Sequence, residues 1–347
     1  MIEWEISDSD IEATERLLLP DRAQFSEDAR EVIRCWHSTD VAACPGSGKT
    51  TVLLAKLKLL ADRMPFGNGA GICVLSHTNV AVDEIKTRLS NYADKLLSYP
   101  NYIGTIQSFV DKFVTMPYLR NLTGRNVQAV DDFTYAQHML NRMQNNKKYS
   151  ALEYVANRNF TTGGQFTERL EHTQALYLRE DGALCVGKQK SPLAGADKVS
   201  SKLYKILKGD LLKDERIMTY RDAYYYAAVA VDKLPATYTE LFSSRFQYVF
   251  IDEYQDCDDV QRRAIDAIFN AENCVVIKIG DSDQAIYNSS ENEIPDWVPN
   301  DGFLPIMTSC RYSQEIANAI CKLKKGKDSI VTLMGNTGVK PVLLIFP

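Results

Sequence analysis

The chain has 347 residues, of which 45% are hydrophobic and 24% are charged. This composition is typical of a globular protein, and the length is sufficient for two or more domains with sizeable cores. The formal net charge of −5 excludes a basic field over the whole surface, so nucleic acid could bind only to a local patch.

Cysteine usage and hydropathy indicate a soluble protein of the cytoplasm. The eight cysteines include no C-x-x-C pair, which favours buried thiols in a reducing compartment over zinc sites or disulfides. Residues 1–10 are acidic and lack the apolar core of a signal peptide. No apolar run approaches membrane-spanning length, so we expect no membrane partner.

The first predicted elements lead to a glycine-rich loop. Residues 1–24 are polar and acidic, with a short helix predicted at 11–19. Ser26 is a suitable N-cap for a second helix that extends to about Trp36. A short strand at 41–44 then leads directly into the loop.

The loop has the sequence AACPGSGKTT at residues 42–51 and opens a predicted helix at 50–60. Gly46 and Gly48 allow the backbone to turn its N–H groups inward, toward the point where the positive end of the helix dipole is aimed. A loop with these properties binds phosphate groups. Because strand, loop and helix follow one another, a simple glycine-rich turn is the less favoured interpretation.

Polar side chains in the loop supply further contacts for a magnesium–nucleotide complex. Lys49 would contact the outer phosphates, and the Thr50 hydroxyl would bind Mg²⁺. The pattern begins with Ala43 in place of the usual glycine. The loop residues that we expect to bind the nucleotide are Gly46, Ser47, Gly48, Lys49, Thr50 and Thr51. The sequence therefore predicts a protein that binds a nucleoside triphosphate.

Strands and helices alternate after the loop. A buried strand is predicted at 72–76, a helix at 80–89, and another strand–turn–helix unit at 102–114. This alternation at short spacing predicts an α/β fold, with a parallel sheet and helices on its faces.

The alternation stops between Met116 and about Thr219. This segment is polar and mostly helical in pattern, and it is too long for a loop in a compact domain, so we expect an inserted subdomain. Its later part, 187–216, is rich in lysine. A nucleic-acid-binding face and a solvated helical surface are about equally compatible with that stretch.

Three later strands each lead into polar residues. The strand at 246–251 leads into Asp252 and Glu253, the strand at 274–280 into residues 281–284, and the strand at 303–307 into residues 309–311. Open α/β sheets bind ligands just beyond the carboxyl ends of their strands. A phosphate-loop NTPase requires a carboxylate there for Mg²⁺, which Asp252 supplies, and Glu253 is placed to orient or deprotonate the attacking water.

Six segments resemble, in order, the motifs of superfamily 1 helicases of the UvrD, Rep and PcrA type. They are 43–50 (motif I), 76–79 (motif Ia), 104–108 (motif Ib), 248–261 (motif II), 280–287 (motif III) and 309–312 (motif IV). The resemblance covers nearly the whole chain, and motifs II and III are its most specific parts. It implies a P-loop NTPase whose RecA-like parallel sheet is flanked by helices. The implied domains are a first RecA-like domain at 1–115 and 220–335, an inserted, mainly helical accessory subdomain at 116–219, and the start of a second RecA-like domain at 336–347.

The resemblance assigns roles to the side chains at the nucleotide. Glu253 would be the catalytic base, Gln284 would sense the γ-phosphate, and Arg311 would act as an arginine finger. Thr50 and Asp252 would hold Mg²⁺. A surface arginine near a helix start is the alternative interpretation of Arg311.

The resemblance also implies contacts with nucleic acid. The residues concerned are His77, Thr78, Asn79, Thr105, Gln107 and Tyr287. Thr78, Thr105 and Gln107 would touch the backbone of a single strand, and Tyr287 would lie against the nucleic acid. For Thr105 and Gln107, capping of the next helix is the alternative.

Three departures from the family pattern affect binding. The glutamine that reads adenine corresponds to Ala29, and Gln24 is the nearest substitute for it. Cys310 occupies the position of an aromatic residue that stacks on the base. Ser289 and Ser290 replace a Trp-Arg pair that grips DNA. We therefore expect loose selectivity for adenine and a weaker grip on the strand.

Two functions from different classes follow. The first is an ATP-dependent DNA helicase or translocase that uses ATP and Mg²⁺, binds single-stranded or tailed DNA and moves 3′ to 5′. The alternative is a UvrD-like DNA-sensing ATPase subunit that regulates a partner nuclease, as in antiviral defence, with little unwinding of its own.

Other functions and the extent of the chain are further expectations. The intact set of nucleotide-binding side chains disfavours a non-catalytic nucleic-acid-binding protein. The forms of motifs II and III disfavour the RNA helicases of nonsense-mediated decay, which motif Ia also resembles. Because a lone strand is predicted at 341–347 and would have an unprotected edge, we expect the chain to be the N-terminal half of a motor.

Overall fold

The computed structural model describes residues 5–157, 166–179, 181–187, 191–233, 236–269, 274–284, 297–322 and 330–332. Tyr287, Ser289, Ser290 and the strand expected at 341–347 lie outside these residues. The chain divides into two units: Met1–Val110 with Lys233–Pro347, and Asp111–Asp232. None of the helices in the described residues is both long and apolar enough to span a bilayer.

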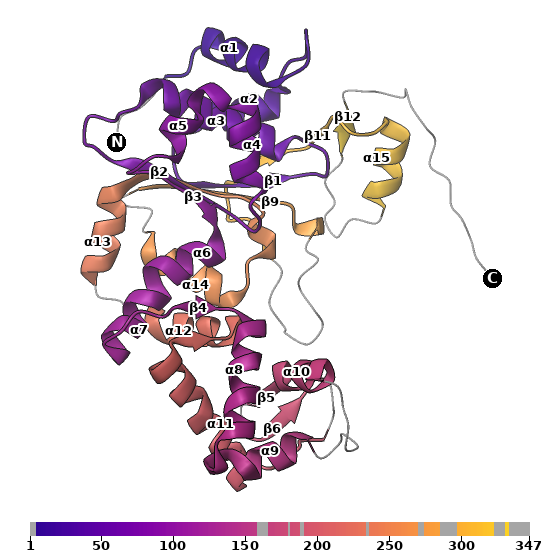
Figure 1. The fold of residues 1–347 in the computed structure, drawn as a ribbon. Helices are drawn as coiled ribbons and strands as arrows, with labels where there is room; N and C mark the ends of the chain where they lie inside the picture. The colour runs from indigo at the N-terminus through magenta and orange to yellow at the C-terminus, as the bar shows by residue number, and fades with distance from the viewer. Residues whose placement is uncertain are drawn as a thin grey trace, which may run out of the picture. The chain divides into compact units, whose positions relative to one another are not determined.

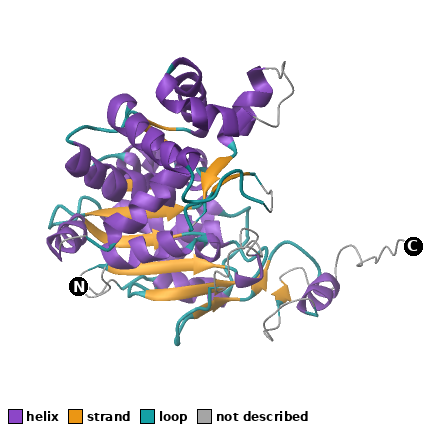
Figure 2. Ribbon diagram, turned by 90° about the horizontal axis from the view of Figure 1, so that it is seen from below, coloured by secondary structure: helices purple, strands orange, loops and turns teal. Residues whose placement is uncertain are grey.

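The first unit is built on a six-stranded sheet in the order β10-β1-β9-β8-β2-β3. Its strands are β1 (Thr39–Ala43), β2 (Gly71–Ser76), β3 (Tyr102–Thr105), β8 (Phe246–Ile251), β9 (Val275–Gly280) and β10 (Leu304–Ile306). All neighbouring pairs are parallel, as the alternation of strands and helices predicted. Figure 2 shows these strands side by side among the helices.

Helices cover both faces of this sheet (Figure 1). The helices of the first unit are α1 (Asp8–Leu18), α2 (Glu27–Arg34), α3 (Lys49–Arg63), α4 (Val80–Arg88), α5 (Ser90–Leu97), α6 (Ile106–Val110), α13 (Ala236–Arg245), α14 (Asp259–Ile268) and α15 (Gln314–Cys321). On one face, α1 to α5 share a hydrophobic core with the sheet, for example Ile11 and Leu57 with Phe250. On the other face, Phe109 of α6 and Phe242 of α13 pack their rings together.

Burial on both faces explains the sequence of the central strands. Every residue of β2 is buried, although its sequence GICVLS shows no alternation of apolar and polar residues. A parallel strand that is covered by helices on both sides is expected to be apolar throughout. The bounds of β8 are those predicted from the run FQYVFI for the same reason.

The second unit is mainly helical and has its own core. Its helices are α7 (Met116–Thr123), α8 (Asp132–Asn145), α9 (Ser150–Asn157), α10 (Phe166–Gln174), α11 (Val199–Asp210) and α12 (Tyr220–Val231). Two short strand pairs accompany them: β4 (Ala129–Val130) with β7 (Ile217–Met218), and β5 (Leu176–Leu178) with β6 (Leu184–Val186). Met139, Leu152 and Leu207 are fully buried in the core of this unit.

The bounds of the second unit differ from the expected 116–219. Helix α12 was expected in the ATPase domain, but it belongs to the second unit. Ala223 of this helix packs with Leu119 and Met218, and Asp222 forms an ion pair with Lys208. The lysine-rich stretch therefore uses at least one of its charges inside the unit.

Candidate active site

The carboxyl ends of four neighbouring strands bring the predicted nucleotide-binding residues to one edge of the sheet. The loop after β1 carries Lys49, the turn after β8 carries Asp252, and the turn after β9 carries Asp281. The segment after β10 carries Arg311. The strands pair in register near these ends, for example Ala42 with Gly280 and Ala43 with Ile306 in two parallel pairs. Parallel pairing thus assembles residues that are far apart in the sequence.

The loop between β1 and α3 has the backbone that a phosphate-binding loop requires. Gly46 and Gly48 adopt left-handed conformations with φ of 78° and 81°, where a side chain would be strained. Helix α3 begins at Lys49, one residue before its expected start, so its N-terminal N–H groups follow the loop directly. The Ser47 hydroxyl oxygen is buried and finds no hydrogen-bond partner among the described residues. A free hydroxyl in such a loop is a suitable donor to a phosphate oxygen.

The segment after β10 is hydrogen-bonded to the phosphate loop. Ser309 Oγ and the Tyr312 hydroxyl both donate to the Pro45 carbonyl, at 3.0 and 2.9 Å. The Cys310 N–H donates to the Gly46 carbonyl at 3.0 Å. A Cβ atom on Gly46 would lie 2.6 Å from Arg311 Cβ, so glycine is also required here by space. These contacts bring Arg311, which is exposed, beside the phosphate loop.

The two carboxylates after β8 have different environments. Asp252 is 5% exposed, and burial followed by the neighbouring Glu253 raises its pKa to about 6, against the opposing effect of Lys49. Glu253 has a left-handed backbone with φ of 53°, which is a strained conformation for a residue with a side chain. Its Oε2 atom lies 3.2 Å from Lys49 Nζ. The acidic pair is therefore adjacent to the phosphate loop.

A buried amide and a further aspartate complete this edge, and neither was assigned a role from the sequence. Gln255 is 1% exposed; its Nε2 donates to Glu253 Oε2 at 2.8 Å, and its Oε1 accepts from the Asp281 N–H at 2.9 Å. Gln284 donates to Asp281 Oδ2 at 2.6 Å. Burial raises the pKa of Asp281, with Lys49 opposing it. The position of Asp281 directly after an apolar strand, like that of Asp252, is the signal that could have identified it.

The residues present fit a magnesium–nucleotide complex. Thr50 is half-buried at the start of α3, whereas the Thr51 hydroxyl accepts from Arg88 Nη1 at 3.2 Å. The described residues contain no cluster of three or more His, Cys, Asp and Glu side chains that could hold a metal by themselves. That is compatible with Mg²⁺, which typically uses one or two protein oxygens together with substrate phosphates. The partnerless Ser47 hydroxyl and the left-handed glycines provide the complementary phosphate contacts.

The residues considered for adenine recognition differ in their exposure to solvent. Gln24 is exposed and precedes α2. Ala29 lies within α2 and is 2% exposed, because it packs in the core beneath the helix. Asp28 accepts hydrogen bonds from the Met307 and Thr308 N–H groups at 2.7 and 3.0 Å. Asp28, which precedes Ala29 at the position expected for the glutamine, thus binds the backbone after β10.

The residues predicted to contact nucleic acid follow β2 and β3, at the other end of the same edge. Ser76 pairs with Thr105 across the two strands, which brings 77–79 next to the start of α6. Thr78 is exposed, and its hydroxyl accepts from the Val80 N–H at 3.4 Å. The Thr105 hydroxyl donates to Ser108 Oγ at 2.7 Å and accepts from the Ser108 N–H at 3.1 Å. Thr105 therefore caps α6, as its alternative interpretation stated.

The other predicted nucleic-acid residues are placed as follows. Asn79 is exposed at the N-cap position of α4, and His77 is half-buried before it. Gln107 is half-buried in the first turn of α6. Tyr287 falls outside the described residues. Five of the six residues thus belong to two adjacent strand–helix units.

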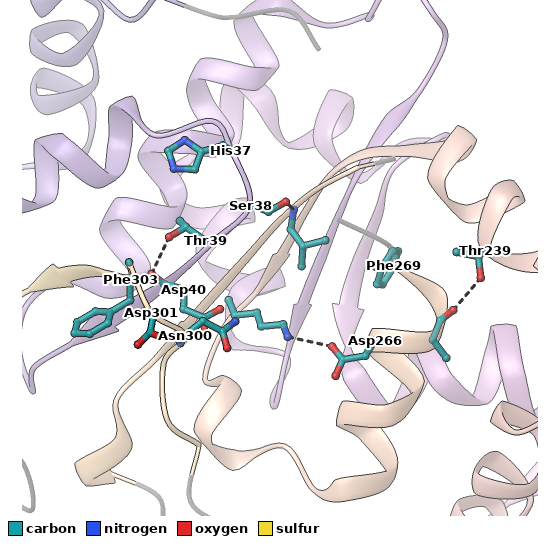
Figure 3. Close-up of a pocket in the computed structure, with 14 residues that line it drawn as sticks. His37, Ser38, Thr39, Asp40, Thr239, Asp266, Phe269, Asn300, Asp301 and Phe303 are labelled. Carbon is teal, nitrogen blue, oxygen red and sulfur yellow. Dashed lines mark hydrogen bonds and ion pairs between the residues drawn. The ribbon is translucent and has the colours of Figure 1, made fainter. Parts of the chain in front are cut away.

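A pocket of about 690 Å³ lies at the opposite edge of the sheet (Figure 3). Its lining includes His37 and Asp40 at the start of β1. The polar groups that line it bind one another: Lys278 Nζ pairs with Asp266 at 3.0 Å, and the Thr239 hydroxyl donates to the Ala267 carbonyl at 2.9 Å. This pocket is separated from the phosphate loop by the length of the strands, and none of the predicted site residues lines it.

Comparison with known proteins identifies the family. A model described as the UvrD/REP helicase N-terminal domain matches residues 26–294. An ATP-dependent DNA helicase srs2 from Schizosaccharomyces pombe is 24% identical over 286 residues, which cover 78% of this chain and 30% of that protein. An ATP-dependent DNA helicase PcrA from Staphylococcus epidermidis is 22% identical over 247 residues, which cover 71% of this chain and 31% of that protein.

A third relative is similar over a shorter part of the sequence. Gabija protein GajB from Bacillus cereus is 32% identical over 104 residues, which cover 30% of this chain and 19% of that protein. The chain thus spans less than a third of the length of these relatives. The family match covers well over half of the chain. This chain belongs to the UvrD/REP helicase N-terminal domain family, and its six-stranded parallel sheet is the RecA-like P-loop fold of that family.

Proposed function

We propose that this chain carries the first motor domain of an ATP-dependent DNA helicase or translocase of the UvrD type. The observation that carries the proposal is the meeting of Lys49 with Glu253 at 3.2 Å, beside the buried Asp252. A phosphate-binding lysine, a metal-binding carboxylate and a candidate base are thereby adjacent. The family match and the two similar DNA helicases support the same activity.

The side chains divide the work of ATP hydrolysis among them. Thr50 and Asp252 would hold Mg²⁺, which neutralises developing charge on the phosphate oxygens when it is bound. Lys49 binds the outer phosphates, which compete with Glu253 for its ammonium group and so release the Glu253 carboxylate. Glu253 then orients the attacking water and accepts its proton. Gln284 and Arg311 would both contact the γ-phosphate.

Single-stranded or tailed DNA is the proposed partner of the β2–β3 end of the edge. Thr78, Asn79, Thr105 and Gln107 contact its backbone, and His77 stacks on a base. Tyr287 also contacts the DNA. The second unit serves as the accessory helical subdomain, and movement is 3′ to 5′. None of the eight cysteines, all of which lie in the described part of the chain, forms a disulfide, and this supports a location in the reducing cytoplasm.

The test is ATP hydrolysis and unwinding by the full-length protein. ATPase activity should rise when single-stranded DNA is added, and a duplex with a 3′ tail should be separated. Lys49→Ala is the negative control, because it removes the charge that faces the phosphates. If the wild type hydrolysed no ATP with or without DNA, the proposal would be wrong.

A second candidate is a DNA-sensing ATPase subunit that controls a partner nuclease. The match to Gabija protein GajB favours it, and so does Cys310 in place of a base-stacking aromatic residue. DNA-dependent ATPase activity without separation of a tailed duplex would favour this candidate over the helicase.

A further inference from the structure

We propose that Gln255 is a positioning residue that holds the catalytic base Glu253 and links it to the turn that carries Gln284. The proposal deepens the ATPase function above and rests on it. Gln255 lies in a short helical turn, Tyr254–Asp256, directly after the acidic pair. Its side chain bridges motif II and motif III by hydrogen bonds to Glu253 and to Asp281.

The orientation of the Gln255 amide follows from its partners. The Asp281 N–H can only donate, so the side-chain oxygen of Gln255 must face it, at 2.9 Å. The Nε2 group then faces two carboxylates, Glu253 Oε2 at 2.8 Å and Asp256 Oδ2 at 3.2 Å. Each polar atom of this amide therefore has a partner, and the reversed orientation would lose all of these bonds.

The space around the amide leaves it little freedom. Gln255 is 1% exposed. A Cβ atom on Gly280 would lie 2.8 Å from Gln255 Oε1 and 2.5 Å from Trp297 Cζ3. The backbone of β9 can approach the amide this closely only because residue 280 is glycine. A buried, fully bonded amide is a rigid support for the carboxylate that it contacts.

The bonds form a continuous path from the phosphate loop to Gln284 in motif III. Lys49 and Gln255 both donate to the same oxygen of Glu253, and Gln255 in turn accepts from the backbone of Asp281. The carboxylate of Asp281 accepts from Gln284. When Lys49 transfers to the nucleotide phosphates, Gln255 is the donor that keeps Glu253 in place. If the 281–284 turn moved toward the γ-phosphate, the Gln255 amide would transmit that movement to the Glu253 carboxylate.

Two substitutions separate the two functions of the amide. Gln255→Met removes both the donor and the acceptor at nearly constant length. Gln255→Glu keeps an oxygen for the Asp281 N–H but removes the donor to Glu253. The matched control is Gln247→Met on β8, whose amide contacts Tyr248 and Asn68 and not the acidic pair.

The experiment uses the full-length protein with three measurements. They are the kcat of DNA-stimulated ATP hydrolysis, the Kd of a non-hydrolysable ATP analogue, and hydrogen exchange in a peptide that contains Asp281. We expect kcat to fall about tenfold to a hundredfold in both Gln255 variants, as a misplaced catalytic group does. The Kd should stay within about threefold of the wild type, because the phosphate loop is unaltered. Exchange at Asp281 should accelerate in Gln255→Met and stay slow in Gln255→Glu, and the control should match the wild type in every measurement.

Several results would overturn the proposal. A kcat of Gln255→Met within about twofold of the wild type would show that Glu253 does not depend on the amide. Equal losses in kcat and in affinity for the analogue would indicate a general structural role. Slow exchange at Asp281 in both variants would show that the amide does not hold the turn that carries Gln284. Absence of hydrolysis in the wild type would overturn the ATPase function and this inference together. A hydrolysing wild type with an inactive Glu253→Gln variant and a fully active Gln255→Met variant would overturn the inference alone.

Discussion

The two ends of the carboxyl edge belong to the same parallel sheet, but different strands form them and their side chains are held in different ways. At the β10-β1-β9-β8 end, side chains from different strands bind one another, as Lys49 does with Glu253 and Gln255 with Asp281. At the β2–β3 end, the hydroxyls of Thr78 and Thr105 bind groups within three residues in the sequence. The end proposed to bind the nucleotide is therefore held together by contacts between strands, whereas the end proposed to bind nucleic acid consists of segments whose polar side chains bond locally. Four predictions test this difference, from the largest expected effect to the smallest.

Glu253→Gln should separate nucleotide binding from hydrolysis. We expect kcat to fall about 10²- to 10⁴-fold, because the phosphate and metal ligands are retained while the base is lost. Calorimetry should show nearly unchanged affinity for Mg-ATP. Glu240→Gln on the exposed surface of α13 is the control and should hydrolyse ATP normally. If Glu253→Gln hydrolysed ATP at nearly the wild-type rate, Glu253 would not be the catalytic base.

Asp252→Asn should stabilise the fold at high pH and not at low pH. The pKa of Asp252 is about 6 in the folded protein, above its usual 3.8, because the carboxylate is buried. The stability associated with the protonated carboxyl is present below about pH 4 and is lost as the pH rises through 6. Removing the ionised group should therefore raise the free energy of unfolding by about 3 kcal/mol at pH 8, in the presence of a chelator, and by little at pH 4.

The measurement for this prediction is denaturant unfolding of both proteins at the two pH values. Asp83→Asn, an exposed aspartate in the first turn of α4, should change stability by less than about 0.5 kcal/mol at either pH. A gain at pH 4 as large as that at pH 8 would mean that ionisation of Asp252 is not the cause.

The affinity for a nucleotide should depend less on its base than on its phosphate groups. Ala29 is buried and Cys310 cannot stack on a ring, so neither expected adenine contact is present. We expect ATP and GTP to bind within about tenfold of each other, a difference of about 1.4 kcal/mol. Competition calorimetry with both nucleotides measures it. A hundredfold preference for ATP would show that another group, such as Gln24, reads adenine.

Thr105→Ala should affect only the β2–β3 end. It removes a hydroxyl that caps α6, which should lower the free energy of unfolding by about 1 kcal/mol. Affinity for single-stranded DNA should fall by several-fold, while affinity for Mg-ATP stays unchanged. Thr105→Ser keeps the hydroxyl and should restore both properties. If Thr105→Ala altered nucleotide affinity as strongly as DNA affinity, the two ends would not be separate.

The parts of the site that could be predicted are those encoded in contiguous residues. The phosphate loop and the acidic pair after β8 each combine an apolar strand with a short polar sequence, and the fold places both as expected. The link between Gln255 and Asp281 could not be predicted, because it depends on which two strands become neighbours and on their register. The hydrogen bond from Arg88 to the Thr51 hydroxyl could not be predicted either, because it joins two different helices, α3 and α4.

The fold shows the same division between local and non-local information. Long apolar runs gave the strands β2, β8 and β9 with bounds within a residue of those observed. The paired strands β4 and β7 are two residues each, which is too short for any periodic pattern. Helix α12 has a clear helical sequence, but its place in the second unit depends on contacts with Leu119 and Met218. Local sequence determines that a helix forms and leaves its packing partner open.

The hydrogen bonds from 309–312 to the phosphate loop have a mechanical consequence. Pro45 and Gly46 are attached by three bonds to a segment that continues into α15, and Tyr312 and Ala317 share a small core with Cys44. A displacement of α15 would therefore be transmitted to the loop through these bonds. Amide exchange at Cys310 reports the linkage, since a displacement that broke it would expose that N–H group. The position of the phosphate loop thus depends on two attachments: the strand β1 that precedes it, and the hydrogen bonds from 309–312 to Pro45 and Gly46.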